Sequence, residues 1–111
     1  PRSTPLYSSA AADVYKRQVS STKTMACEFV DYGIRVNAVA PGWIVTEMHY
    51  GQHPDPAARK KELETTPISS CIMKRRAGPE EVAAAIAFLV SHDASYITGA
   101  TIYINGRQWM G

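Results

Sequence analysis

The chain has 111 residues, of which 45% are hydrophobic and 20% are charged, a balance typical of one small soluble domain. Its formal net charge of +2 is too small to indicate binding to nucleic acid or to an anionic membrane. No apolar run approaches the ~20 residues that a membrane-spanning helix needs, and the amino terminus carries no signal-peptide pattern. We therefore expect a cytoplasmic protein with no membrane or nucleic-acid partner.

Residues 1–18 differ in character from the rest of the chain. The sequence begins at Pro1 rather than at a methionine, and Ala11–Gln18 resembles translated adapter sequence from the end of an assembled read. We therefore expect residues 1–18 to be a disordered or spurious segment. Its alanines favour a helix, but helix propensity alone does not indicate a functional site.

From Val19 onward the pattern indicates alternating helices and strands. Apolar and small residues recur at helical spacing at Val19, Thr22, Ala26, Phe29 and Val30. Gly33 follows where a helix is expected to end. The nearly continuous apolar run 34–40, which ends at Pro41-Gly42, predicts a strand covered on both faces.

Two further helices and a second strand follow. Asp55-Pro56 predicts a helix that extends to Glu64, since aspartate is a good N-cap and proline a good first residue. Gly78-Pro79 predicts the start of another helix. Its expected buried stripe consists of Val82, Ile86, Leu89 and Val90. Residues 101–104 form the second predicted strand, followed by an Asn105-Gly106 turn.

This order of elements predicts an α/β fold that is incomplete as a domain. A strand, a helix and another strand imply a parallel pair with a right-handed crossover. Two parallel strands do not make a stable sheet by themselves, and these two are apolar enough to expect further strands and helices around them. We therefore expect only part of a doubly wound parallel sheet.

The most informative stretch lies at the carboxyl end of the first predicted strand. Ligands of open α/β sheets bind beyond the carboxyl ends of the strands. Gly42 lets a ligand approach the backbone closely, and Thr46 offers a hydroxyl group. A plain turn that ends the strand explains the Pro-Gly pair equally simply, and Trp43 is compatible with packing alone.

The region 19–111 resembles the last third of the short-chain dehydrogenases/reductases. The matching motifs are Thr22-Lys23, Arg35-Val36-Asn37 before Pro41-Gly42, Thr46, the run from Arg76 to Val82, and Ile97-Thr98-Gly99. The resemblance implies the carboxyl-terminal part of a Rossmann-like fold and an oxidoreductase that exchanges hydride between NAD or NADP and an alcohol or carbonyl substrate.

The resemblance also assigns roles to residues. It implies that the cofactor contacts are Pro41, Gly42, Ile44 and Thr46. The backbone of Ile44 would bond to the nicotinamide carboxamide, and the hydroxyl of Thr46 to the carboxamide or the diphosphate. Residues 47–77 would form a mobile lid over the substrate. Family members usually form dimers or tetramers through the last helix and strand, so a homo-oligomer is expected.

The catalytic pair of this family is not found in the chain. The family uses Tyr-x-x-x-Lys, in which the nearby lysine lowers the pKa of the tyrosine. Counting back from Lys23 places that pair at Ala11 and Tyr15, neither of which fits. We therefore expect no catalytic residue here and an inactive isolated chain. The alternative is a catalytically dead relative that retained the fold for binding or oligomerisation.

Two other site types receive little support. Basic clusters could indicate a small nucleic-acid-binding module, but they are separated and balanced by glutamates, without interleaved aromatic residues: Lys60-Lys61 and Lys74-Arg75-Arg76. His49 and His53 have the spacing of a helical metal pair, but Gly51 and Pro54 disfavour that helix, so no metal site is expected. The isolated Cys27 and Cys71 are expected to be small buried residues.

The first prediction concerns the segment before Val19. Resequencing the source locus should reveal Tyr-x-x-x-Lys just upstream of the Val19 codon, and a Gly-x-x-x-Gly-x-Gly phosphate loop farther upstream. A verified gene that encodes the present residues 1–18 would instead favour the catalytically dead relative.

Overall fold

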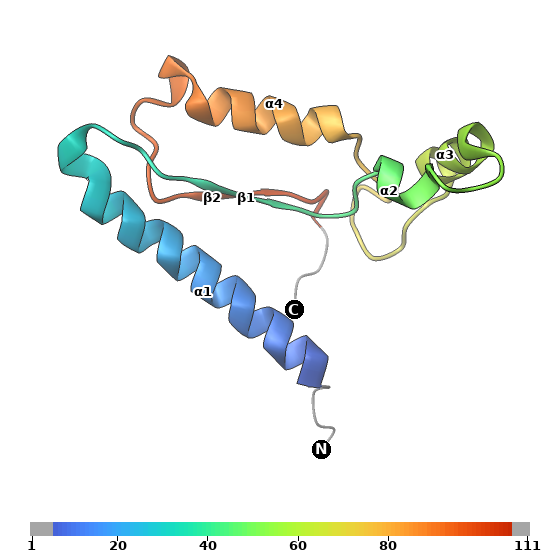
Figure 1. Cartoon of the computed structure of the whole chain (residues 1–111), viewed down its shortest axis with the longest axis horizontal. Coiled ribbons are helices and arrows are strands. Elements are labelled where there is room, and N and C mark those ends of the chain that lie inside the picture. Colours follow the sequence, from blue (N-terminus) through green and yellow to red (C-terminus); the bar gives the residue numbers. More distant parts are fainter. Residues whose placement is uncertain (1–5, 108–111) are drawn as a thin grey trace. The chain divides into compact units, whose positions relative to one another are not determined.

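The computed structural model describes residues 6–107, with side chains described from Asp13 onward. It is an α/β structure in which two parallel strands form a single sheet (Figure 1). The helices are α1 (Leu6–Phe29), α2 (Glu47–Tyr50), α3 (Pro56–Thr65) and α4 (Pro79–Val90), the strands are β1 (Ala38–Pro41) and β2 (Thr101–Ile104), and two 3-10 turns are η1 (Val30–Tyr32) and η2 (His92–Ala94).

The described chain divides into two compact units. The first contains residues 6–38 and 95–101, so it holds α1, η1 and the loop that enters β2. The second contains residues 39–94 and 102–107, with α2, α3, α4, η2 and most of both strands.

Helix α1 includes most of the segment predicted to be disordered or spurious. Residues 6–18 form its first part, whereas residues 1–5 lie outside the described residues. Alanine-rich sequence forms helix readily, so a helix here does not reveal a function. The assignment of residues 1–18 to a segment outside the family sequence stays a prediction.

The end of α1 is fixed by Gly33, as the sequence predicts. Gly33 has a φ of 74°, a left-handed conformation that glycine adopts without steric cost, and its N–H donates to the Val30 carbonyl at 3.0 Å. Thr22 and Ala26, on the predicted inner face of α1, are buried. The helix and the 3-10 turn that continues it therefore end at Gly33 as predicted, whereas Val30, the last residue of the apolar series, is 54% exposed.

The first strand is shorter than predicted, because it begins at Ala38 rather than at Ile34. Residues 35–37 bond to the loop 97–100 instead of forming a ladder. Asn37 Nδ2 donates to the Ile97 carbonyl at 2.9 Å, and Asn37 Oδ1 accepts from the Ala100 N–H at 3.0 Å. A side chain that bonds to a distant backbone in this way competes with regular strand pairing.

The loop before β2 also depends on a glycine. Gly99 has a φ of 74°, and its N–H donates to the Val36 carbonyl at 2.7 Å. A Cβ atom at this position would lie 3.4 Å from the Ala26 Cβ of α1, so space is not the obstacle. The obstacle to another residue at this position is the backbone conformation, because any residue with a side chain is strained at this φ.

The two strands pair in parallel but are less covered than the sequence predicts. The Ala38 N–H donates to Ala100 at 2.9 Å and the Gly42 N–H donates to Ile104 at 3.0 Å, which sets the register. The second strand has the predicted bounds. Ala38–Ala40 are half-buried rather than enclosed on both faces. Two strands thus remain open to neighbours that a doubly wound sheet would supply.

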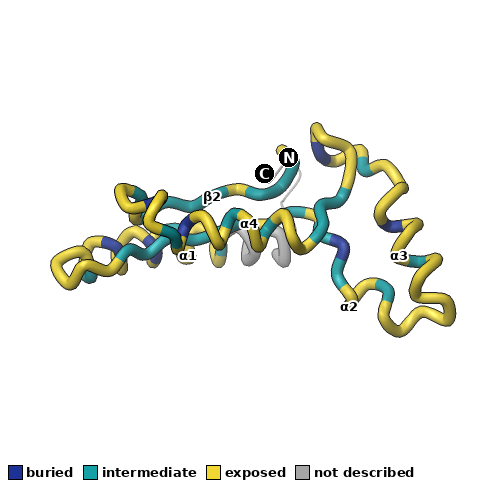
Figure 2. Tube along the Cα trace, turned by 90° about the horizontal axis from the view of Figure 1, so that it is seen from above, coloured by how far each residue is buried: buried dark blue, intermediate teal, exposed yellow. Residues whose placement is uncertain are grey.

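The predicted buried stripe of α4 is largely wrong. The helix starts at Pro79 and ends at Val90, but of the four apolar residues only Leu89 is buried, at 7% exposed. Figure 2 shows that most of α4 is exposed. Ile86 is 44% exposed and Val90 is 76% exposed. The amphipathic pattern is present, but the second unit has too little sheet to cover it. No large side chain among the described residues is completely buried.

The Asn37 contacts generate the second prediction. Asn37→Leu removes both hydrogen bonds and should speed amide exchange at Ala100 and Ala38 by about tenfold, because a buried hydrogen bond is worth on the order of 1 kcal/mol. Asn37→Asp is the matched control, since it keeps the acceptor for the Ala100 N–H and loses only the donor to Ile97. Exchange measured by NMR should rank the control between Asn37→Leu and the original chain; equal rates in all three would contradict this account.

Candidate functional site

The candidate site begins where β1 ends. Pro41 is the last residue of β1 and is exposed, and the half-buried Gly42 bonds to Ile104 at the end of β2. The chain then leaves the pair of strands through residues 43–46. The predicted site residues therefore follow the carboxyl end of a parallel strand, which is where α/β sheets bind their ligands.

A short bridge to Ala77 holds this segment extended. Ile44 and Ala77 form an isolated parallel β-bridge. The Ala77 N–H donates to the Trp43 carbonyl at 2.9 Å, and the Val45 N–H donates to the Ala77 carbonyl at 2.9 Å. Both bonds use the neighbours of Ile44, so its own N–H and C=O point away from Ala77. Within residues 6–107, neither of these two groups of Ile44 has a hydrogen-bond partner.

Thr46 lies at the junction with α2. It is the N-cap residue of this four-residue helix, and its hydroxyl oxygen lies 3.2 Å from His49 Nδ1. The Thr46 carbonyl accepts from the His49 N–H at 2.9 Å. Since α2 ends at Tyr50, His53 lies outside it, and the two histidines do not share a helix face.

The segment 47–77 is attached to the site at several points. Trp43 Nε1 donates to Ser70 Oγ at 3.1 Å, and the Met73 N–H donates to the Gly106 carbonyl at 3.1 Å. Arg76 donates to the Leu63 carbonyl near the end of α3 at 3.2 Å. Helix α3 has the predicted aspartate cap. The mobility of this segment as a lid stays a prediction.

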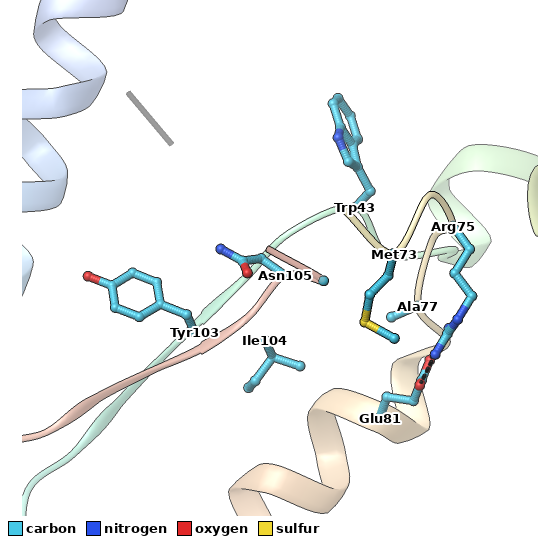
Figure 3. A pocket seen from close by; sticks show the side chains of 9 residues that line it. Trp43, Met73, Arg75, Ala77, Glu81, Tyr103, Ile104 and Asn105 are labelled. Atoms are coloured by element: carbon cyan, nitrogen blue, oxygen red, sulfur yellow. Dashed lines mark hydrogen bonds and ion pairs between the residues drawn. The ribbon is translucent and has the colours of Figure 1, made fainter. Parts of the chain in front are cut away.

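An ion pair follows the Ala77 bridge. Arg75 donates to both carboxylate oxygens of Glu81, from Nη1 at 3.0 Å and from Nη2 at 2.9 Å (Figure 3). Glu81 also accepts from the Gly78 N–H at 2.9 Å, which caps the start of α4. The Arg75 hydrogen bonds, followed by that of Gly78, lower the pKa of Glu81 to about 2. Glu81 thus stays ionised in all but strongly acidic solution.

A cavity of about 160 Å³ adjoins this pair at the carboxyl end of β2. Met73, Ala77 and the Arg75–Glu81 pair lie together on one side of it (Figure 3). Ile104 points from β2 towards α4, whereas Trp43 points away from the other labelled side chains. The cavity combines apolar walls with a fixed ion pair.

Three other kinds of candidate feature are metal-ligating groups, membrane-spanning helices and the cysteines. The described residues contain no group of three histidine, cysteine or acidic side chains that could hold a metal ion. None of the helices between residues 6 and 107 is both long and apolar enough to cross a membrane. Cys71 is buried as expected, but Cys27 is exposed on α1, which corrects the expectation that both are buried.

The sequence did not indicate Ala77 or Arg75 as parts of the site. Glu81 could have been found, because it is the third residue after the Gly78 cap, where a carboxylate often binds the cap N–H. Its ion pair with Arg75 could not be predicted, because the pair depends on how the turn between the two residues folds. Ala77 carries no chemical side chain, so only its backbone bonds reveal its role.

A scan against protein-family models matches residues 4–106 to the family described as enoyl-(acyl carrier protein) reductase. The match includes most of the segment 1–18. Curated relatives include glucose 1-dehydrogenase 2 from Bacillus subtilis, 48% identical over 77% of this chain and 31% of the relative. A 3-oxoacyl-[acyl-carrier-protein] reductase, FabG, from Vibrio cholerae is 38% identical over 94% of this chain and 38% of its own length.

The chain also resembles solved structures of oxidoreductases. A putative oxidoreductase from Escherichia coli K-12 matches with a TM-score of 0.68 and 30% identity, over 88% of this chain and 33% of that one. A 4-hydroxyisoleucine dehydrogenase complexed with NADH matches with a TM-score of 0.63 and 28% identity, over 86% of this chain and 37% of that one. The chain spans about a third of the length of the proteins that it matches.

The third prediction concerns the pKa of Glu81. Its folded value of about 2 lies below the ordinary 4.5, so the Arg75–Glu81 pair contributes stability above pH 4.5 that is lost as the pH falls through 2. The pair is exposed to solvent, which screens it, so we expect this contribution to be small. A carbon-13 NMR titration should show Glu81 ionised at pH 3, and Arg75→Ala should raise its pKa. An unchanged titration in that variant would contradict the assigned cause.

Proposed function

The chain belongs to the short-chain dehydrogenase/reductase family, and we propose that the whole protein is an NAD(P)-dependent oxidoreductase acting on an alcohol or carbonyl substrate. The observation that carries the proposal is the backbone of Ile44, whose N–H and C=O have no partner among the described residues and lie just beyond the carboxyl end of β1. The named relatives are dehydrogenases and reductases, and one structural neighbour was solved with NADH.

The donor set at this segment fits a nicotinamide carboxamide. A carboxamide has one carbonyl oxygen and one amino group, so it can accept from the Ile44 N–H and donate to the Ile44 carbonyl. Pro41 and Gly42 direct the chain to this position, and the Thr46 hydroxyl offers a further polar contact. The nicotinamide supplies or accepts the hydride, while these residues orient its ring towards the substrate. NAD and NADP satisfy the same contacts.

We further propose that the isolated chain is inactive. A Tyr-x-x-x-Lys pair, which the family uses to move the hydroxyl proton, does not occur in the 111 residues. This absence also supports the second candidate, a catalytically dead relative that binds or oligomerises without hydride transfer. Sequence from the locus upstream of Val19 separates the two candidates.

The remaining proposals concern the substrate side and the assembly. We propose that residues 47–77 cover a small-molecule alcohol or carbonyl substrate. The hydrogen bonds between Ala77 and residues 43 and 45 join the start of this segment to its end. A homo-oligomer is supported by the apolar side chains that α4 and β2 expose, at Ile86, Phe88, Val90 and Tyr103. A cytoplasmic location is part of the same proposal.

A chimera tests the proposed function and gives the fourth prediction. Residues 19–111 replace the corresponding part of the B. subtilis glucose 1-dehydrogenase 2, and glucose oxidation with NAD or NADP is measured. We expect activity. Ile44→Pro removes one backbone donor and should raise the KM for the nicotinamide about tenfold, while Ile44→Ala, which keeps that donor, should change it by less than about twofold.

The proposal fails if the folded chimera, verified by circular dichroism and gel filtration, has no activity. Equal KM values in the proline and alanine variants would show that the Ile44 backbone does not contact the cofactor. Both measurements use NAD and NADP in parallel, so they also reveal which nucleotide the segment accepts.

A further inference from the structure

Glu81 gathers three N–H donors at the end of the segment 47–77. Two come from the guanidinium of Arg75 and one from the backbone of Gly78. Arg75 Nη1 also donates to the carbonyl of its neighbour Arg76 at 3.2 Å. These contacts fix both ends of the four-residue turn 75–78. A bidentate arginine–carboxylate pair restricts geometry more than a single ionic contact does.

Ala77 lies inside this turn and forms the β-bridge with Ile44. Its N–H and C=O bond to Trp43 and Val45, on either side of Ile44. A rotation of the peptide groups around Ala77 would break one or both bonds. The orientation of the Ile44 backbone therefore depends on the conformation of residues 75–78.

We infer that Glu81 is a positioning residue for cofactor binding: with Arg75 it fixes the turn 75–78, through which Ala77 holds the Ile44 backbone in the orientation that a carboxamide requires. The identity of the ligand rests on the proposed function; the mechanical link from Glu81 to Ile44 does not. The contacts of Glu81 are with Arg75 and Gly78, so we infer that it acts on Ile44 through the turn and Ala77.

Charge and exposure agree with a local role. Glu81 is ionised at physiological pH and accepts all three N–H groups, and these contacts lower its pKa further. Both side chains are partly exposed, at 46% for Arg75 and 41% for Glu81. Exposed ion pairs contribute little to global stability, so loss of this pair should loosen the turn without unfolding the chain.

Amide hydrogen exchange in the full 111-residue chain tests the link without any cofactor. Glu81→Ala and Arg75→Ala should each speed exchange at Ala77 and Val45 by about fivefold, through local opening of the bridge. The Gly42 N–H, bonded to Ile104 in the sheet, serves as the internal control and should not change. Glu80→Ala is the matched control variant, because it removes a neighbouring carboxylate in the first turn of α4 but none of these contacts.

Two further variants sharpen the test. Glu81→Gln keeps the shape of the side chain and one acceptor oxygen, so its exchange rates should fall between those of Glu81→Ala and the original chain. The double variant of Arg75→Ala and Glu81→Ala should speed exchange by less than the two single effects combined, because both substitutions remove the same Arg75–Glu81 pair. Additive effects would show that the two residues act separately and would overturn the inference.

The chimera connects the link to the cofactor. In it, Glu81→Ala should raise the KM for the nicotinamide about fivefold and leave the KM for glucose unchanged, with Glu80→Ala unchanged in both. An equal rise in exchange at Gly42, or no rise at Ala77, overturns the inference. If the unsubstituted chimera is inactive, the proposed function fails, while the exchange rates still decide whether Glu81 positions Ile44.

Discussion

Two hydrogen bonds to the backbone of Ala77 determine how the chain continues beyond β1. They hold residues 43–45 extended and join the start of the segment 47–77 to its end. Because the cost of closing a loop grows slowly with its length, a segment with joined ends tolerates changes in length and sequence. The same two bonds therefore hold the backbone around Ile44 extended and close the segment 47–77 at the same time.

Limited burial is the second physical feature of this chain. The strands are half-buried, and most apolar side chains of α4 are exposed. The chain spans about a third of the length of its relatives. The apolar face of α4 is larger than the area that two strands can cover. A helix can therefore carry the correct periodicity and still lack the surface against which it packs.

The features that could be predicted from the sequence are those that depend on contacts between residues close together in the chain. The ends of α1, α3 and α4 depend on caps within a few residues, at Gly33, Asp55 and Gly78, and were predictable. The start of β1 was not, because Asn37 bonds to a loop some 60 residues away. The candidate site segment was proposed from its resemblance to the family, because the Pro-Gly pair alone is explained equally well by a plain turn. Ala77, which bonds to this segment, could not be identified from the sequence, because only its backbone takes part.

The motifs that resemble the family most strongly do not all serve the same purpose. The Asn37 amide uses its donor and its acceptor on the chain's own backbone, at Ile97 and Ala100, so it has little capacity left for a ligand. Ile44 is the opposite case, because its side chain is chemically inert while its backbone groups have no partner within residues 6–107. A distinctive residue type therefore marks the scaffold here, and an undistinctive one marks the proposed contact. Hydrogen-bond satisfaction, rather than residue identity, separates the two roles.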